Sequence, residues 1–137
     1  MTDNVLQTAN TRNVFKFLEK TYDETFSLLV FARDYFTAKS ALDKSKLSPH
    51  DSCVYSLAMS VITTQLTSCL AWLLLCRAVQ NGEVGVDVLK NEQYKMPEFD
   101  VEINETNSGF SSLNPIVREM LSRSSRIYKR VKRISRS

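Results

Sequence analysis

Glycine and proline are scarce in this chain of 137 residues, which contains three of each. The alternation of apolar and polar residues that is typical of half-buried strands is also nearly absent, and it occurs only at residues 99–103. So few turn residues and so little strand pattern exclude a β-rich fold. We therefore predict an all-α protein, whose 43% hydrophobic residues are enough to bury one core.

Histidine and cysteine are scarce as well, with one histidine, His50, and three cysteines, Cys53, Cys69 and Cys76. The cysteines fall on one predicted helix, about 24 Å and about 10 Å apart, so no two can pair within it. This inventory favours a reduced, cytoplasmic protein. A single histidine does not supply a zinc site, and no nucleophile and base converge in the pattern. We expect no enzymatic activity, no metal site and no cofactor.

Charged residues are absent from residues 52–76, although the pattern there is too regular for a loop. Ser48 and Pro49 have the chemistry of a helix start, and Asn81-Gly82 has that of a helix end, so we predict a long central helix over residues 49–81. Two apolar stripes run along it and require neighbours on two sides. The first stripe comprises Tyr55, Ala58, Ile62, Leu66, Cys69, Leu73 and Cys76, and the second comprises Leu57, Val61, Thr64, Ser68, Ala71, Leu75 and Val79.

An uncharged run of this length is also long enough for a transmembrane helix. Eight serine, threonine or glutamine residues interrupt it, however, and its purely apolar part, residues 70–76, is short. Amphipathic helical sequence precedes it, without the pattern of a secretory signal. We therefore favour a buried core helix and expect no membrane insertion.

Two further amphipathic helices are predicted, over residues 13–38 and 114–135, from apolar residues that recur at steps of three and four. With the central helix they would form an antiparallel three-helix bundle, a single domain of residues 13–137. The remaining segments are predicted to be a flexible N-terminal arm at residues 1–12, a possible short helix at 87–95 and an irregular acidic loop at 98–109.

The last predicted helix is strongly basic on the face opposite its apolar seam. From Leu113 onward eight cations stand against Glu119 alone, whereas residues 87–109 carry a net charge of −4. Such a concentration of cations attracts any anionic surface. The candidate partner-binding residues are Arg118, Arg123, Arg126, Lys129, Arg130 and Arg133.

Three interpretations of this basic face stay open. One is contact with nucleic acid, although neither interleaved aromatic residues nor a helix-turn-helix pattern supports base recognition. Another is contact with an acidic protein surface. The third is a solvated helix whose cations complement the helix dipole and meet the acidic loop of the same chain.

A specific residue pattern runs through all three predicted helices. Its most distinctive part is Trp72-Leu73-Leu74, Arg77-Ala78-Val79 and Gly82-Glu83, and it continues in the last helix with Val117-Arg118-Glu119. This pattern resembles the RcdA family, the regulator-of-CtrA-degradation proteins of alphaproteobacteria, which are also grouped as a domain of unknown function. The residues that we take as the family motif are Tyr22, Asp23, Arg33, Asp34, Tyr35, Trp72, Arg77, Gly82 and Glu83.

The resemblance implies a three-helix bundle, often dimeric, that acts as a non-enzymatic adaptor. Such proteins help deliver cell-cycle substrates to the protease ClpXP, together with the regulator CpdR and, for CtrA, with PopA. On this basis we expect a cytoplasmic homodimer whose partners are the ClpXP machinery, CpdR-like or PopA-like regulators, and substrates. The alternative function is a nucleic-acid-binding protein that acts through its basic last helix.

Overall fold

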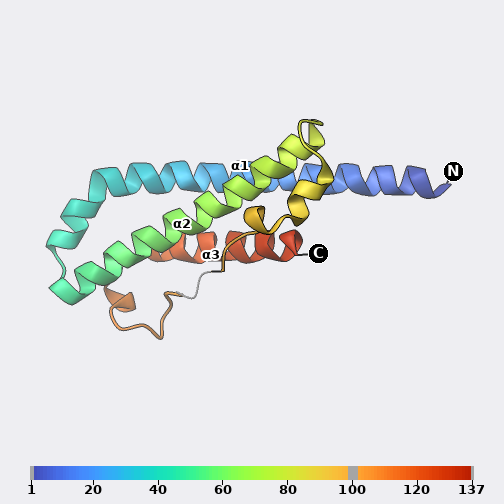
Figure 1. Cartoon of the computed structure of the whole chain (residues 1–137). Coiled ribbons are helices and arrows are strands. Elements are labelled where there is room, and N and C mark those ends of the chain that lie inside the picture. Colours follow the sequence, from blue (N-terminus) through green and yellow to red (C-terminus); the bar gives the residue numbers. More distant parts are fainter. Residues whose placement is uncertain (1, 99–101, 137) are drawn as a thin grey trace.

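Three α-helices make up most of the molecule: α1 (Thr2–Ser45), α2 (Pro49–Gln80) and α3 (Pro115–Ser135) (Figure 1). The computed structural model describes residues 2–98 and 102–136, with side chains from Arg12 onward. Between α2 and α3 lie three short 3-10 turns, η1 (Val86–Lys90), η2 (Glu92–Tyr94) and η3 (Phe110–Ser112). The described residues contain no strand, so the predicted all-α fold with three packed helices is confirmed.

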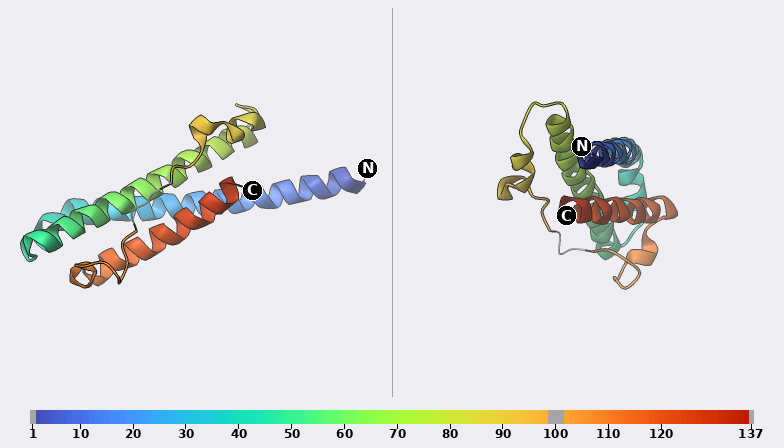
Figure 2. Two further views of the ribbon diagram at one scale, coloured as in Figure 1. Left: turned by 60° about the horizontal axis from the view of Figure 1, so that its bottom comes forward. Right: turned by 90° about the vertical axis from the view of Figure 1, so that its right-hand side faces the viewer.

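The helix directions refine the expected antiparallel arrangement. Helix α1 runs antiparallel to both of its neighbours, whereas α2 and α3 run parallel to each other (Figure 1). The hydrogen bond from Ser124 Oγ to Gln65 Oε1, at 3.0 Å, joins the middles of these two parallel helices. The parallel course arises because the connection between α2 and α3 leads back to the end of the bundle at which α2 begins, as Figure 1 and the left view of Figure 2 show.

Helix α1 is longer than predicted at both ends, since it spans Thr2–Ser45 and not residues 13–38. Its backbone is helical through residues 2–12, where we expected a flexible arm. The physical reason is that neither glycine nor proline occurs before Pro49, so nothing in the covalent chain interrupts the helix. Residues 39–45, which follow the predicted helix, contribute about two further turns before α1 ends.

The possible short helix at residues 87–95 is replaced by the two 3-10 turns η1 and η2. Asn91 separates them, because its backbone is extended (φ −71°, ψ 130°) and its side chain caps η2 by accepting from Gln93 N at 3.0 Å. Residues 102–109 contain no helix, as predicted for the irregular loop, whereas residues 99–101 of that prediction lie outside the described residues.

The ends of α2 follow the predicted capping chemistry. Ser48 Oγ accepts from Asp51 N at 3.2 Å, and Pro49 occupies the first turn. At the other end Gly82 has a left-handed backbone (φ 75°), and the amides of Gly82 and Glu83 donate to the carbonyls of Val79 and Ala78. This pair of bonds is a Schellman motif, which satisfies carbonyls that the helix leaves unpaired.

The first stripe of α2 forms the centre of the core. Leu66 is fully buried (0% exposed), as are its stripe neighbours Ala58, Ile62 and Cys69, and Trp72 beside the stripe is buried too. Helices α1 and α3 pack against this one side of α2. The core residues that they contribute are Leu18, Leu28, Ala32 and Phe36 from α1 and Val117, Met120, Leu121, Ile127, Tyr128 and Val131 from α3.

The second stripe of α2 has no helix packed over it, so our expectation of neighbours on two sides was wrong. Both neighbouring helices share the first stripe, and the second faces outward, with Leu57 45% exposed and with Thr64 and Ala71 exposed. Among the described residues, only the turns η1 and η2 lie near the C-terminal half of this stripe. Helix α2 therefore presents an uncharged outer face.

Candidate functional site

The basic face of α3 is the strongest candidate site from the sequence, and the structure divides it into paired and unpaired cations. Arg130 reaches Glu24 of α1 (Nη1 to Oε2, 3.1 Å), and Lys129 reaches Glu102 (Nζ to Oε1, 3.3 Å). The acidic connection thus meets the basic helix, as one of the three interpretations expected. Part of the positive charge of α3 is neutralised within the chain.

Glu98 is the other acidic group that contacts this helix. It pairs with Arg136 and, at 3.7 Å, with Lys132. The hydrogen bond from Arg136, reinforced by the charges of Lys132 and Arg136, lowers the pKa of the Glu98 carboxyl. All these ion pairs are at least partly exposed to water, so each contributes little to stability by itself.

Three of the candidate arginines remain free to meet a partner. Among the described residues, Arg123, Arg126 and Arg133 form no ion pair, and Arg126 and Arg133 are exposed one heptad apart on α3. Arg118 is different, because it is half-buried and its Nε is buried without a hydrogen-bond partner among the described residues. The surface that can hold an anionic partner is therefore Arg123, Arg126 and Arg133, which we call the open arginine face.

The family-motif residues do not converge on one surface. The Arg77 guanidinium lies 4.3 Å from the centre of the Tyr22 ring, a cation–π contact that joins α2 to α1. Trp72 is in the core, and Gly82 and Glu83 form the C-terminal cap of α2. Their positions suit packing and helix termination.

Four motif residues of α1 lie elsewhere. Arg33 pairs with its neighbour Asp34 at 2.9 Å, and both side chains are well exposed. Asp23 is exposed and forms no ion pair within the described residues. Tyr35 donates from its hydroxyl to Asp43 Oδ2 at 2.8 Å, which connects it to a polar cluster.

Asp43 is the centre of this cluster, which we did not predict from the sequence. Its Oδ2 accepts from Tyr55 Oη at 2.7 Å and from Asn114 Nδ2 at 3.0 Å, in addition to Tyr35. Burial would raise the pKa of Asp43, but the hydrogen bonds from Tyr55, Tyr35 and Asn114 together outweigh it and lower the pKa. The only sequence signal was Tyr55, a hydroxyl-bearing residue on an apolar stripe, which needs a partner when it is buried.

The remaining reactive groups are dispersed. Burial raises the pKa of the Cys69 thiol to about 12 and that of Cys76 to about 11, so both stay protonated at neutral pH. Cys53 is exposed near the start of α2. His50 Nε2 lies 3.2 Å from Ser108 Oγ in the loop before η3. Within the described residues no group of three or more His, Cys, Asp or Glu side chains is placed to bind a metal ion.

Helix α2 is the one described helix that is long and apolar enough to cross a membrane by length and composition. Its first stripe packs against α1 and α3, which is the arrangement of a core helix in a bundle. Helix α2 is therefore the core helix of a three-helix bundle, with one face buried and the other exposed.

Comparison with known proteins identifies a solved structure of similar fold and a protein family. The structure is similar to the crystal structure of RcdA from Caulobacter crescentus CB15, with a TM-score of 0.68 and 23% sequence identity over 88% of this chain and 89% of that one. No match was found among the curated proteins. A family model described as a protein of unknown function (DUF1465) matches residues 10–137, and the chain therefore belongs to this family.

Proposed function

We propose that this protein is a non-enzymatic adaptor that helps deliver cell-cycle substrates to the protease ClpXP through protein–protein contacts. The single observation that carries the proposal is a bundle of the RcdA type in which Arg123, Arg126 and Arg133 form no ion pair among the described residues, beside cations that the chain itself neutralises. An unpaired cation keeps more of its field for a partner than a paired one does.

The proposed partners follow from the same likeness. They are the ClpXP machinery, CpdR-like or PopA-like regulators, and the substrates themselves, all met in the cytoplasm. The protein would act as a homodimer, since two-fold dimers are the commonest oligomers. Light scattering that finds only the 15.7 kDa species at micromolar concentration would contradict the dimer.

Partner recovery from a lysate tests the proposal. The test variant carries Arg123→Gln, Arg126→Gln and Arg133→Gln, and the matched control carries Lys129→Gln, Lys132→Gln and Arg136→Gln. Both lose three positive charges from the same helix, but the control loses only cations that already pair with Glu98 or Glu102. We expect the test variant to lose its partners and the control to keep them.

Nuclease treatment separates the proposed adaptor from nucleic-acid binding, the second candidate function that the open arginine face permits. Recovery of ClpX, a CpdR-like regulator or a discrete substrate after nuclease supports the adaptor. Loss of every partner after nuclease contradicts it. In that case affinity for duplex DNA should also fall with salt, by about 0.9 log unit per log unit of salt for each phosphate neutralised.

A further inference from the structure

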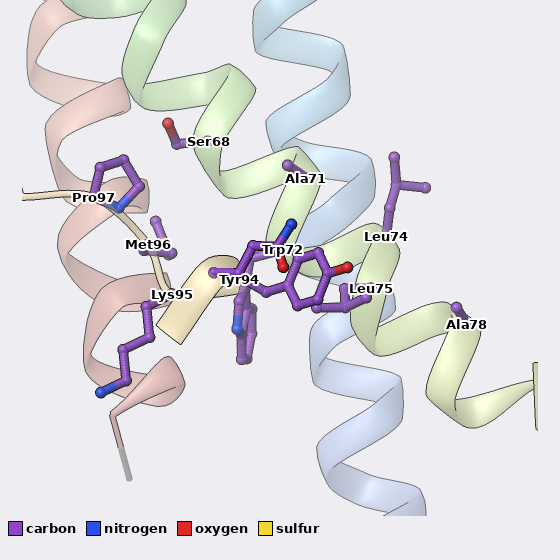
Figure 3. A pocket seen from close by; sticks show the side chains of 11 residues that line it. Ser68, Ala71, Trp72, Leu74, Leu75, Ala78, Tyr94, Lys95, Met96 and Pro97 are labelled. Carbon is purple, nitrogen blue, oxygen red and sulfur yellow. The ribbon is translucent and has the colours of Figure 1, made fainter. Parts of the chain in front are cut away.

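An apolar groove of about 500 Å³ lies on the outer face of α2, between its C-terminal half and the segment from η2 to Pro97 (Figure 3). Ala71, Leu75 and Ala78 form its floor on α2, and Tyr94 and Met96 form the opposite wall. Lys95 is the only charged residue among those that line it. A groove with these walls takes an apolar side chain.

The groove belongs to a helix face that is unusual for a surface exposed to water. No charged residue occurs from Ser52 to Cys76, yet this outer face leaves Leu74 47% exposed. Exposed tyrosine is also enriched where proteins bind one another, and Tyr94 is 42% exposed at the edge of the groove. Apolar grooves of this kind are where the anchor side chains of a partner protein insert.

A second hollow, of about 610 Å³, adjoins the groove across the backbone of Lys95 and Met96, which line both. Its lining carries three cations, Lys90, Lys95 and Arg136, against Glu98 alone. In Figure 3 Tyr94 projects from η2 on the side of Leu75, whereas Lys95 projects on the side of α3. The segment therefore has an apolar hollow on one side and a cationic hollow on the other.

Lys95 is available to a ligand at little cost. Its Nζ pairs with Glu92 Oε1 at 2.7 Å, but both side chains are more than half exposed. An exposed pair three residues apart contributes little, so a carboxylate from a ligand can replace Glu92. The apolar groove and the cation beside it thus favour one ligand chemistry, an apolar residue followed by acidic residues.

We infer that the groove between α2 and the η2–Pro97 segment binds an acidic peptide of a partner protein, which inserts an aliphatic side chain between Ala71 and Tyr94 and places carboxylates near Lys90 and Lys95. The inference rests on the proposed adaptor function and adds to it a binding surface separate from the open arginine face. Charge complementarity selects this occupant, because a second copy of the chain would bring another uncharged helix face and leave the cationic hollow unused.

Fluorescence anisotropy with labelled peptides tests the inference on the full chain. The probe is acetyl-EELLEE, and the comparison peptides are acetyl-EESSEE, which lacks the apolar anchor, and acetyl-KKLLKK, which reverses the charge. We expect the probe to bind and both comparison peptides to bind at least about tenfold more weakly, because each loses one of the two complementary features.

Matched variants then locate the binding. Ala71→Glu introduces a charge into the groove, whereas Ser60→Glu introduces the same charge on the same outer face of α2 but outside it. Both positions are exposed, so circular dichroism should show unchanged folding. We expect Ala71→Glu to weaken probe binding at least about tenfold and Ser60→Glu to leave it unchanged. Equal effects of the two variants, or no binding of the probe, would overturn the inference.

Two controls separate this inference from its alternatives. The variant of Arg123, Arg126 and Arg133 should still bind the probe, because its substitutions lie outside the groove. If the wild-type protein recovers its partners from a lysate but does not bind the probe, the groove is refuted and the adaptor proposal stands. Sedimentation tests the alternative that a second copy of the chain occupies the groove. Self-association that Ala71→Glu abolishes and Ser60→Glu preserves, without probe binding, would assign the groove to a second copy and contradict the peptide.

Discussion

Asn114 at the start of α3 donates from Nδ2 to the Asp43 carboxylate of α1 at 3.0 Å, while its Oδ1 caps α3 by accepting from Val117 N at 3.0 Å. One side chain therefore both begins a helix and ties it to another. Because Tyr55 of α2 donates to the same carboxylate oxygen, all three helices meet at Asp43. This cluster fixes the end of the bundle at which the parallel helices α2 and α3 both begin.

Replacing Asp43 with alanine should destabilise the fold by about 2 kcal/mol, since it removes hydrogen bonds to a charged group and leaves two tyrosine hydroxyls without their acceptor. Urea unfolding measures this free energy. Asp23→Ala is the control, because the Asp23 carboxylate is exposed. A loss below about 0.5 kcal/mol at Asp43 would mean that the cluster does not stabilise the bundle.

Stability should also depend on pH through Asp43. Its folded pKa lies below the unfolded value, which is about 4. The contribution is therefore complete above about pH 4 and is lost as the pH falls through the folded pKa. Unfolding free energies measured across this acidic range should fall less steeply for Asp43→Asn than for the wild type. Parallel curves for the two proteins would refute a lowered pKa.

Leu66→Ala and Leu57→Ala compare the two stripes of α2 by the same chemical change. Leu66 is 0% exposed and Leu57 is 45% exposed. We expect a loss of about 2 to 5 kcal/mol for Leu66→Ala, from the cavity and the lost burial, and less than about 1 kcal/mol for Leu57→Ala. Similar losses at the two positions would contradict the open outer face of α2.

The three thiols should react at different rates. Burial keeps Cys69 and Cys76 away from solvent and raises their pKa values, whereas Cys53 is exposed. A thiol reagent should therefore modify Cys53 in the native protein and the other two only after unfolding in urea. The Cys53→Ser variant should then show almost no rapid reaction. Rapid modification of that variant under native conditions would show that the core opens readily.

The sequence was most informative where a single helix determines the pattern. The absence of charge from Ser52 to Cys76, the first stripe and the caps at Ser48 and Gly82 together predicted α2 almost to the residue. The N-cap Asn114 likewise predicted the start of α3. Each of these signals is local, because capping and helical periodicity involve residues within a few positions of one another.

The sequence was less informative wherever distant residues meet. Asp43 lies between two predicted helices and was not recognised as a structural residue, because its partners Tyr55 and Asn114 are brought to it only by the fold. The parallel course of α2 and α3 depends on the path of the long connection between them, and the spacing of apolar residues within a helix does not predict that path. The second stripe of α2 faces outward although it carries no charge, so its burial was predicted wrongly.

Charge counting on α3 could predict a basic face but not which of its cations are free. The pairs of Arg130 with Glu24 and Lys129 with Glu102 join residues far apart in the sequence. Only the structure therefore separates the open arginine face from the cations that the chain neutralises. The same separation supplies the matched variants that test the proposed function.

Protein turnover tests the proposed adaptor function most directly. Half-lives would be measured by quantitative mass spectrometry after translation is blocked, in cells with and without this protein. The proposal predicts that a discrete set of ClpXP substrates becomes longer-lived in its absence. Normal turnover should return with the wild type and with the control variant of Lys129, Lys132 and Arg136, but not with the variant of Arg123, Arg126 and Arg133. Unchanged half-lives of all ClpXP substrates in cells lacking the protein would contradict it.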